Sequence, residues 1–341
     1  MRPLVSILIP AYNAERWIGD TIRSAEAQNW ARKEIIVVDD GSHDQTLRVA
    51  REFASKNALV VRQENQGASA ARNKAFELCQ GDYIQWLDAD DLLSIDKIAK
   101  QMEAAEQSQN KRLLLSSPWG AFMYRVSAAQ FSPTSLWDDL SPVEWLLRKM
   151  GENLHMQTAT WLVSRELSEA AGSWDVRLSL DDDGEYFCRV VLASDAIRFV
   201  PDGKVFYRQR GSDSISNIDA SDKKLESQLL SMQLHVSYLR SLEESERTRI
   251  ACLEYLQTWY MWFFEERLDL AQQVERLAAT FAGRLKVPRL SRKYHLIEWL
   301  FGHRIAKHVQ FFLRRIKWSL LRLCDRGRLT LEQVKLRNKN W

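Results

Sequence analysis

The chain has 341 residues, of which 45% are hydrophobic and 27% charged, so its composition excludes a wholly disordered or fibrous protein. Its length predicts two domains. The net charge of +3 is unevenly distributed, because residues 281–341 carry 16 Lys and Arg against 3 Asp and Glu, which leaves −10 on the rest. Such a basic end is expected to attract the phosphate groups of lipids or nucleic acids.

Cysteine usage and hydropathy indicate a cytoplasmic protein. The four cysteines are far apart and include no CxxC pair, so we expect reduced thiols and no zinc site. The apolar run near the N-terminus is too short for a signal peptide, and no segment has the roughly 20 apolar residues of a membrane-spanning helix. Any membrane contact is therefore expected to be peripheral, on the inner face of the cell membrane.

The first third of the chain has the pattern of a layered α/β fold. Short β-branched runs predict strands at 4–9, 34–39, 59–62, 83–87 and 113–116, and apolar residues at helical spacing lie between them. Strands that alternate with helices form a mainly parallel sheet. Residues 1–117 are therefore expected to form a nucleotide-binding half-domain.

The rest of the chain is irregular at first and then helical. Residues 118–215 spread five tryptophans through loops, short strands and a helix near 183–194, which suits a variable substrate-binding half of the same domain. Strand signals vanish beyond about residue 218. We therefore divide the chain into one domain over 1–215 and a helical, basic and amphipathic C-terminal region over 216–341.

Carboxylates follow the predicted strands, at the end where open parallel sheets bind ligands. Asp88 and Asp90 flank Ala89 directly after the fourth strand. They could bind Mg²⁺ or Mn²⁺ and the ribose of a nucleotide diphosphate, since these cations prefer oxygen ligands and leave several positions to phosphate and water. An isolated pair of this kind is more often a helix cap, but the position after a strand favours the metal.

Other strand ends offer contacts for a nucleotide. Asp40 could accept a hydrogen bond from a pyrimidine N–H or form an Asx-turn, and Tyr12 could stack on a base or cover the sheet edge. The small residues from Gly67 onward allow a ligand to approach the following helix. Arg72 on that helix could bind a phosphate oxygen or pair with a surface carboxylate.

Four segments, in this order and spacing, resemble the family 2 glycosyltransferases: VSILIPAYNAE, IIVVDDGSHDQT, ENQGASAARNKA and GDYIQWLDADD. The resemblance covers residues 3–215 approximately. It implies the GT-A nucleotide-diphospho-sugar transferase fold, a mostly parallel central sheet with flanking helices, followed here by an α-helical C-terminal appendage.

The resemblance also implies roles for the matching residues. Asp40 would contact uracil, Asp90 would bind Mn²⁺ or Mg²⁺ under the diphosphate, and Asp88 would lie nearest the ribose and share the metal. The other expected donor contacts are Pro10, Tyr12, Asn13, Glu15, Gly67, Arg72 and Ala89.

The catalytic base of the family lies in an acidic turn before a helix that carries an Arg. Residues 180–189 fit this pattern, and the spacing from Arg189 places Asp183 at the base position, with Asp182 as the alternative. An inverting transfer needs a carboxylate to accept the proton of the attacking hydroxyl, and clustered carboxylates raise one another's pKa. The cluster could also simply cap the helix.

One departure from the family concerns residues 207–214, where several members have a His near the metal or diphosphate and this chain has none. Arg208 or Arg210 either contacts phosphate there or is solvated. The residues expected to line an acceptor pocket are Trp119, His155, Gln157 and Thr158. A lone His such as His155 is, however, more often structural.

The basic end contains a predicted amphipathic helix with Lys and Arg opposite an apolar stripe. The stripe comprises Ile297, Phe301, Ile305, Val309, Phe312, Ile316, Leu320 and Leu323. Such a helix could lie on an anionic membrane, or pack its stripe on the helical region and leave its charges in solvent. No nucleic-acid partner is expected, because the N-terminal part is acidic and resembles no nucleic-acid module.

The sequence therefore predicts an inverting glycosyltransferase that moves a sugar from a nucleotide diphosphate donor, with UDP expected, to a glycan or lipid-linked acceptor hydroxyl in cell-surface polysaccharide synthesis. A sugar-nucleotide nucleotidyltransferase would need a glycine-rich basic loop where Pro10 and Tyr12 stand. A non-catalytic nucleotide-sugar-binding protein would not need the whole acidic set. An NAD-dependent enzyme would need GxGxxG after the first strand, which is absent.

Overall fold

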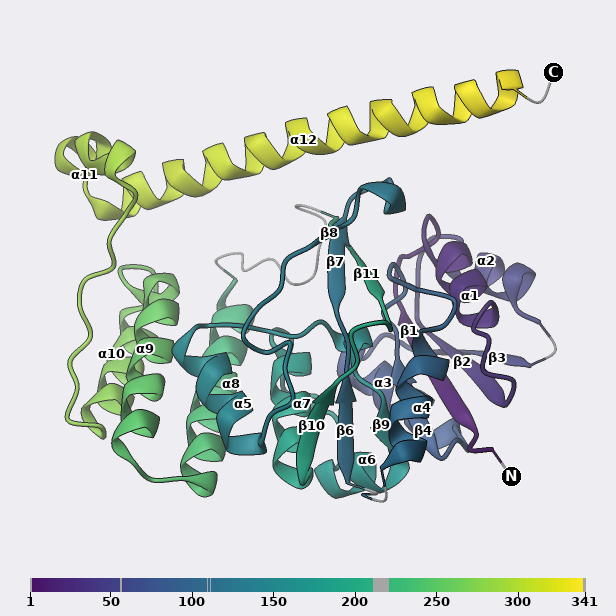
Figure 1. Ribbon diagram of the computed structural model, residues 1–341. Coiled ribbons are helices and arrows are strands. Elements are labelled where there is room, and N and C mark those ends of the chain that lie inside the picture. The colour runs from purple at the N-terminus through teal and green to yellow at the C-terminus, as the bar shows by residue number, and fades with distance from the viewer. Residues whose placement is uncertain (1, 56, 109, 111, 211–220, 340–341) are drawn as a thin grey trace.

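A five-stranded sheet lies at the centre of the N-terminal half in the computed structural model, which describes residues 2–55, 57–108, 110, 112–210 and 221–339 (Figure 1). Its strands are β1 Val5–Ala11, β2 Lys33–Asp40, β3 Ala58–Gln63, β4 Tyr83–Trp86 and β9 Val163–Ser164. Their order in space is β3-β2-β1-β4-β9, and all are parallel except β9. The predicted mostly parallel sheet is confirmed.

Helices cover both faces of this sheet because alternate strand residues point to opposite sides. The helices around it are α1 Ile18–Glu26, α2 Thr46–Phe53, α3 Ala68–Leu78, α4 Lys97–Gln107, α6 Arg165–Ala171 and α7 Asp182–Ala193. Ile7 and Ile9 belong to the core shared with α1, α2 and α4, whereas Leu8 belongs to the core shared with α3 and α7. The α/β layering therefore follows from fully apolar strands with two buried faces.

Two smaller sheets extend the fold beside the central one. β6 Leu113–Ser116 pairs in parallel with β10 Ala196–Phe199, so the predicted strand at 113–116 lies outside the central sheet. A four-stranded sheet has the order β5-β11-β7-β8, made of β5 Leu92–Leu93, β11 Val205–Arg208, β7 Trp119–Phe122 and β8 Gln130–Phe131. β11 pairs with β5, which lies shortly after β4 in the chain. Residues 209–210 therefore lie beside the loop that follows β4.

The chain after residue 220 is helical, as predicted. Its helices are α8 Asp222–Leu242, α9 Glu246–Phe263, α10 Leu268–Ala279, α11 His295–Phe301 and α12 His303–Lys339. α8, α9 and α10 pack as a group in which α9 also contacts α5 Pro142–Gly151, and α8 contacts α7. One hydrophobic core runs from Leu8 and Trp86 through α7 to Phe263 and Val274, so these three helices share the core of the sheet.

α12 is different, because it crosses above the body as a long separate rod (Figure 1). It has 37 residues, which corresponds to a length of about 55 Å at 1.5 Å per residue. Among the residues that the structure describes, no helix is sufficiently long and apolar to cross a membrane.

An aromatic cluster fills the space between the sheet and α7. Trp174 and Tyr186 stack with ring centroids 4.0 Å apart, and Trp86 meets Trp174 edge-on at 5.2 Å. Trp161 stacks on Phe187 at 5.4 Å. Several of the tryptophans that the sequence places in irregular segments are therefore core residues, and they form a rigid floor under the start of α7.

We expect Trp86→Ala to lower the free energy of unfolding by about 3–5 kcal/mol, because it leaves a cavity among aromatic rings that cannot collapse. Denaturant unfolding followed by fluorescence and circular dichroism measures the change. The matched control is Trp299→Ala, since Trp299 is 80% exposed, and its effect should stay within about 0.5 kcal/mol. Equal effects of the two substitutions would contradict this packing.

Candidate active site

A cavity of about 610 Å³ lies at the carboxyl ends of β1, β2 and β4, and its volume is typical of sites for small ligands. Predicted site residues from separate segments line it together: Pro10, Tyr12, Asp40, Gly67, Arg72, Asp88, Ala89, Asp90, His155, Gln157, Thr158, Asp182 and Asp183. Carboxylates that are far apart in the sequence therefore face one space.

Two residues expected to bind the donor do not line the cavity. Asn13 Oδ1 accepts a hydrogen bond from the backbone N–H of His43 at 3.0 Å, and Glu15 Oε2 accepts one from the N–H of Gln45 at 3.0 Å. Both side chains therefore tie the loop after β1 to the loop after β2. A polar residue after a strand can bind a ligand or form hydrogen bonds with a neighbouring loop. Here both side chains bond to the loop after β2.

Trp119, expected in the acceptor pocket, is also outside the lining of the cavity. It packs on His155 with ring centroids 5.2 Å apart and meets Tyr207 edge-on at 5.8 Å. Because His155 and Tyr207 themselves line the cavity, Trp119 supports them from behind.

Asp40 organises the entrance to α3. Its Oδ1 accepts hydrogen bonds from Gln63 Nε2 at 2.7 Å and from the N–H of Gln66 at 3.0 Å, and its Oδ2 accepts one from the N–H of Gly67 at 2.8 Å. Gly67 has a φ of +94°, and a Cβ there would meet no atom within 4 Å. The glycine is therefore required by the backbone turn, and it leaves the start of α3 open to a ligand.

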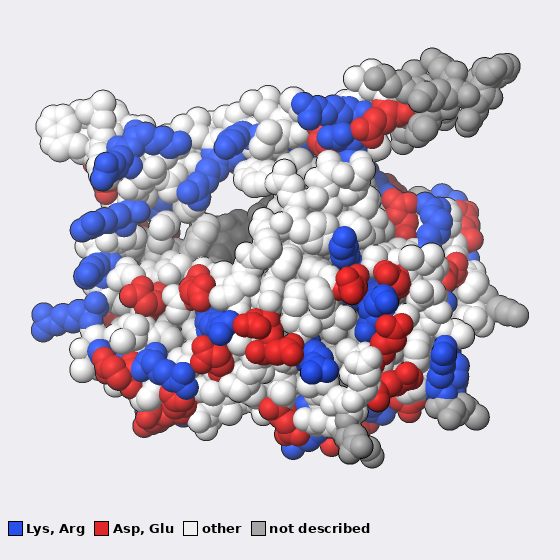
Figure 2. Space-filling model, in the orientation of Figure 1, with Lys and Arg blue, Asp and Glu red and all other residues white. Residues whose placement is uncertain are grey.

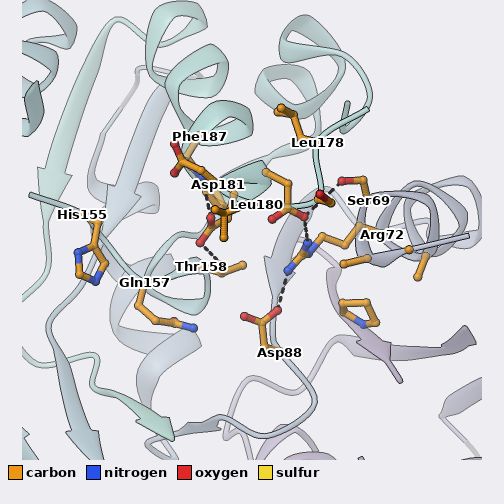
Figure 3. A pocket seen from close by; sticks show the side chains of 18 of the residues that line it. Ser69, Arg72, Asp88, His155, Gln157, Thr158, Leu178, Leu180, Asp181 and Phe187 are labelled. Atoms are coloured by element: carbon orange, nitrogen blue, oxygen red, sulfur yellow. Dashed lines mark hydrogen bonds and ion pairs between the residues drawn. The ribbon is translucent and has the colours of Figure 1, made fainter. Parts of the chain in front are cut away.

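Arg72 joins the two acidic parts of the cavity (Figure 3). Its guanidinium pairs with Asp88 Oδ1 at 2.9 Å and with Asp182 Oδ2 at 2.7 Å. It also lies 4.3 Å from the ring centre of Trp174, and Ser69 Oγ donates a hydrogen bond to Asp182 at 3.2 Å. Arg72 is buried, so its partners are carboxylates of the site and no surface carboxylate pairs with it among the described residues.

The carboxylates after β4 meet two arginines, of which Arg208 is buried and Arg210 is partly buried. Asp90 Oδ2 forms an ion pair with Arg210 Nε at 2.7 Å, and Arg208 Nε donates to the Asp90 carbonyl at 2.8 Å. Asp91 is fully buried and accepts hydrogen bonds from the Arg208 N–H, at 2.8 Å, and from Gln157 Nε2. Burial raises the pKa of Asp90 and of Asp91. Both arginines contact the acidic loop after β4, although the Arg210 side chain stays 19% exposed. Residues 211–214 of that predicted segment lie outside the described residues.

Asp88 and Asp90 fit the binding of a divalent cation together with a diphosphate. Both residues line the cavity, and each uses one carboxylate oxygen in an ion pair, Asp88 with Arg72 and Asp90 with Arg210. The described ranges contain no group of three or more His, Cys, Asp or Glu that could hold a metal by themselves. Mg²⁺ usually takes only one or two protein carboxylates and completes its shell with phosphate and water.

The acidic turn before α7 is held by α8, a contact that the sequence did not reveal. Ser227 Oγ accepts hydrogen bonds from the N–H groups of Ser179 and Leu180 at 2.9 and 3.0 Å. Ser231 Oγ, one helical turn further, donates to Asp181 Oδ2, and Asp181 has a φ of 58°. Two serines at i and i+4 on a helix give no sequence signal of this role.

Asp183 sits at the point where the turn faces the cavity. Its Oδ1 accepts a hydrogen bond from the Gly184 N–H at 2.8 Å and its Oδ2 accepts one from Thr158 Oγ1 at 3.2 Å. Burial, followed by the neighbouring Asp182 and Asp181 carboxylates, raises the pKa of Asp183 to about 7. Asp182 is held by Arg72, whereas Asp183 can exchange a proton near neutral pH, which suits a general base.

Part of the chain is similar to known glycosyltransferases. Residues 6–116 match glycosyl transferase family 2. TuaG of Bacillus subtilis strain 168, a glycosyltransferase named for teichuronic acid biosynthesis, is 42% identical over 105 residues, which are 30% of this chain and 42% of TuaG. The uncharacterized glycosyltransferase EpsJ of the same strain is 28% identical over 219 residues, which cover 61% of this chain and 62% of EpsJ. The chain thus spans less than two thirds of either relative.

The crystal structure of S. aureus TarS 1–349 in complex with UDP-GlcNAc superposes with a TM-score of 0.66, at 18% identity and over 82% of each chain. This similarity establishes the GT-A fold. Over residues 6–116 the chain is therefore similar to the family 2 glycosyltransferases of bacteria.

The raised pKa of Asp183 predicts a pH-dependent gain in stability for Asp183→Asn. In the unfolded chain Asp183 has an ordinary pKa, near 3.8, and in the folded protein about 7. Between these values the folded state binds a proton that the unfolded state has lost, so ionisation destabilises the wild type progressively as pH rises from 4 to 7. Asn keeps the shape without the charge.

The melting temperature of Asp183→Asn should therefore lie further above that of the wild type at pH 8 than at pH 5. Glu103→Gln, at a carboxylate whose side chain is 57% exposed, serves as the control and should follow the wild type at both values. A margin that is the same at pH 5 and pH 8 would show that the Asp183 carboxyl is not perturbed.

Proposed function

We propose that the protein is an inverting glycosyltransferase that moves a sugar from a nucleotide diphosphate, expected to be a UDP-sugar, to a hydroxyl of a glycan or lipid-linked acceptor in surface polysaccharide synthesis. The observation that carries the proposal is the position of Asp183, a carboxylate able to titrate near neutral pH, in the same cavity wall as Asp40, Asp88 and Asp90. The names of TuaG and of the TarS complex support a polysaccharide product and a UDP-sugar donor.

The donor would occupy the end of the cavity at β1, β2 and β4. Asp40, fixed by three hydrogen bonds, would receive the N–H of the base, and Tyr12 would cover its ring. Asp88 and Asp90 would hold Mn²⁺ or Mg²⁺, which supplies positive charge to the departing diphosphate. Arg210, paired with Asp90, adds a fixed cation at the same place.

The transfer step would depend on Asp183. Its carboxylate accepts the proton of the acceptor hydroxyl as that oxygen bonds to the anomeric carbon, while the bond from this carbon to the diphosphate oxygen breaks and the diphosphate leaves with the electron pair. Thr158 holds one carboxylate oxygen and the Gly184 N–H holds the other. The arrangement orients the base so that little reorganisation is needed during the reaction.

Asp183→Asn should lower kcat by about 10²- to 10⁴-fold, because it removes the general base, while UDP still raises the melting temperature. In the wild type, kcat/KM should rise with pH through about 7, since the carboxyl must lose its proton first. Initial rates of sugar transfer between pH 5 and pH 9 measure both effects, with Glu103→Gln as the unchanged control. Full activity in Asp183→Asn would exclude Asp183 as the base.

Binding of the donor should depend on a divalent cation. A nucleotide sugar with Mn²⁺ should raise the melting temperature more than either alone, because a ligand that binds only the folded state stabilises it by mass action. Asp90→Asn should abolish the part of the shift that requires Mn²⁺ and keep the part that UDP gives alone. Equal shifts with and without Mn²⁺ in the wild type would overturn the metal assignment.

A further inference from the structure

The cavity continues away from the donor end into a deeper part, its inner end, between α5, α8 and α9. The residues that line this inner end are Trp145, Lys149, Trp161, Gln228, Tyr255 and Trp259. They come from both sides of residue 216, so helices beyond the family 2 domain form this wall.

Several polar groups of the inner end have no hydrogen-bond partner among the residues that the structure describes. The amide nitrogen and oxygen of Gln228 are buried and make no hydrogen bond within the described residues, and the same holds for the indole N–H groups of Trp145, Trp161 and Trp259. Buried polar groups are normally satisfied, and a set left open on a cavity wall indicates that a ligand or water completes it.

Lys149 adds a charge to this wall. The residue is 6% exposed, and in the described part of the chain its ammonium takes part in no ion pair or hydrogen bond. Asp181 lies in the same cavity lining, where its carboxylate accepts a hydrogen bond from Ser231 and forms no ion pair with Lys149. Burial, and after it the Lys149 ammonium, lower the pKa of the neighbouring His155, so His155 adds no second charge at neutral pH.

The open groups of the inner end are mostly hydrogen-bond donors. The ammonium, the three indole N–H groups and the amide nitrogen donate, and only the Gln228 oxygen accepts. A buried ammonium requires an anionic or strongly polar partner, and aromatic faces beside such groups suit the apolar faces of sugar rings. The wall is therefore complementary to a sugar that carries several acceptor oxygens and a negative charge.

We propose that the inner end binds the acceptor, and that Lys149 and Gln228 recognise an acidic group on it, the carboxylate or phosphate of an anionic glycan. This inference rests on the proposed function, since it assigns the acceptor of the same reaction. Asp183 lines the same cavity as the residues of both ends, so an acceptor bound at the inner end could present its hydroxyl to this carboxylate.

The test compares acidic and neutral oligosaccharides. Titration calorimetry in the presence of UDP and Mn²⁺ would use a glucuronic-acid-containing tetrasaccharide, a phosphorylated tetrasaccharide and a neutral tetrasaccharide. The wild type should bind one acidic ligand about tenfold or more tightly than the neutral one, and the better of the two identifies carboxylate or phosphate. Lys149→Met should remove this preference, and Gln228→Leu should weaken binding of the acidic ligand.

Two controls separate a loss of acceptor recognition from the loss of any lysine charge and from a loss of folding. Lys286→Met, at an exposed lysine outside the cavity lining, should bind like the wild type. Because Lys149 lacks a partner, Lys149→Met should fold at least as stably as the wild type, which thermal unfolding checks. Equal affinity for acidic and neutral ligands, or an unchanged preference in Lys149→Met, would overturn the inference. Failure of UDP to stabilise the wild type would instead contradict the proposed function.

A second observation concerns α12, which meets the body along one side only. Lys307 pairs with Glu266 at 3.4 Å, Phe311 stacks on Trp262 at 4.8 Å, and Asp325 pairs with Arg125 at 2.7 Å. The opposite side, the outer face of α12, consists of Ile305, Phe312, Ile316, Leu320 and Leu323, which are 41% to 64% exposed. The predicted apolar stripe therefore does not pack on the helical region over this stretch, although Ile297 and Val309 pack between α11 and α12.

The Lys and Arg side chains of α12 indicate what kind of partner covers its outer face. Figure 2 shows uncharged side chains along the upper edge of the molecule with groups of Lys and Arg beside them, while Lys, Arg, Asp and Glu are interspersed on the body below. Arg304, Arg315 and Lys317 are exposed along the helix, and residues 281–341 carry the 16 basic residues noted above. Two such helices repel each other, whereas an anionic lipid surface attracts the charges and takes up the apolar side chains.

We propose that the outer face of α12 docks on an anionic membrane, as the sequence predicts for the inner face of the cell membrane. The full chain should sediment with vesicles of phosphatidylglycerol and phosphatidylcholine, and much less with phosphatidylcholine alone or at high salt. The double variant Phe312→Glu with Leu320→Glu should lose this binding. Leu59→Glu, at a residue 46% exposed on β3, is the matched control and should keep it.

Absence of binding to the anionic vesicles would overturn the membrane proposal. The same conclusion would follow if the wild type were a dimer by light scattering that Phe312→Glu with Leu320→Glu converts to a monomer, because a second copy would then cover the face.

Discussion

The buried guanidinium of Arg72 is the constraint on which the site depends. It lies between Asp88, which follows the central sheet, and Asp182, which begins α7. Several carboxylates in one cavity would repel each other strongly where water is scarce. With Arg72 between them, the strand-end loop and the acidic turn are held together, while Asp183 of that turn accepts hydrogen bonds from Thr158 and the Gly184 N–H and forms no ion pair among the described residues. One ion-pair network therefore joins the two acidic parts of the cavity and leaves Asp183, the proposed base, outside it.

The functional unit is larger than the segment that defines the family. The match to family 2 ends at residue 116, whereas Asp183, the proposed base, follows much later in the chain, and Ser227 and Ser231 of α8 hold its turn. α8 in turn belongs to the core that starts at the central sheet. The helices after residue 220 are thus part of the scaffold of the candidate site.

The sequence predicted the strands and site residues that a local pattern identifies. It did not predict the residues that only tertiary packing brings together. The strands β1 to β4 were predicted from apolar runs. Asp40 and Asp90 were predicted from motifs directly after strands, and Asp183 from a motif before a helix. Lys149 and Gln228 lie on helices far apart in the chain, and nothing in either helix indicates that they meet in one cavity. Asn13 was expected to contact the ligand. A polar side chain after a strand can bond either to a ligand or to an adjacent loop, and the fold shows that Asn13 bonds to the loop after β2.

The far end of the chain touches the donor end of the cavity. Arg322 of α12 donates a hydrogen bond to the carbonyl oxygen of Arg210, and the Arg210 side chain pairs with Asp90. A polypeptide shortened to its α/β half would therefore lose an outside contact to the residue that pairs with Asp90. Trimming the basic end would change the surroundings of the proposed donor site, and rates measured on a trimmed polypeptide would not be those of the full chain.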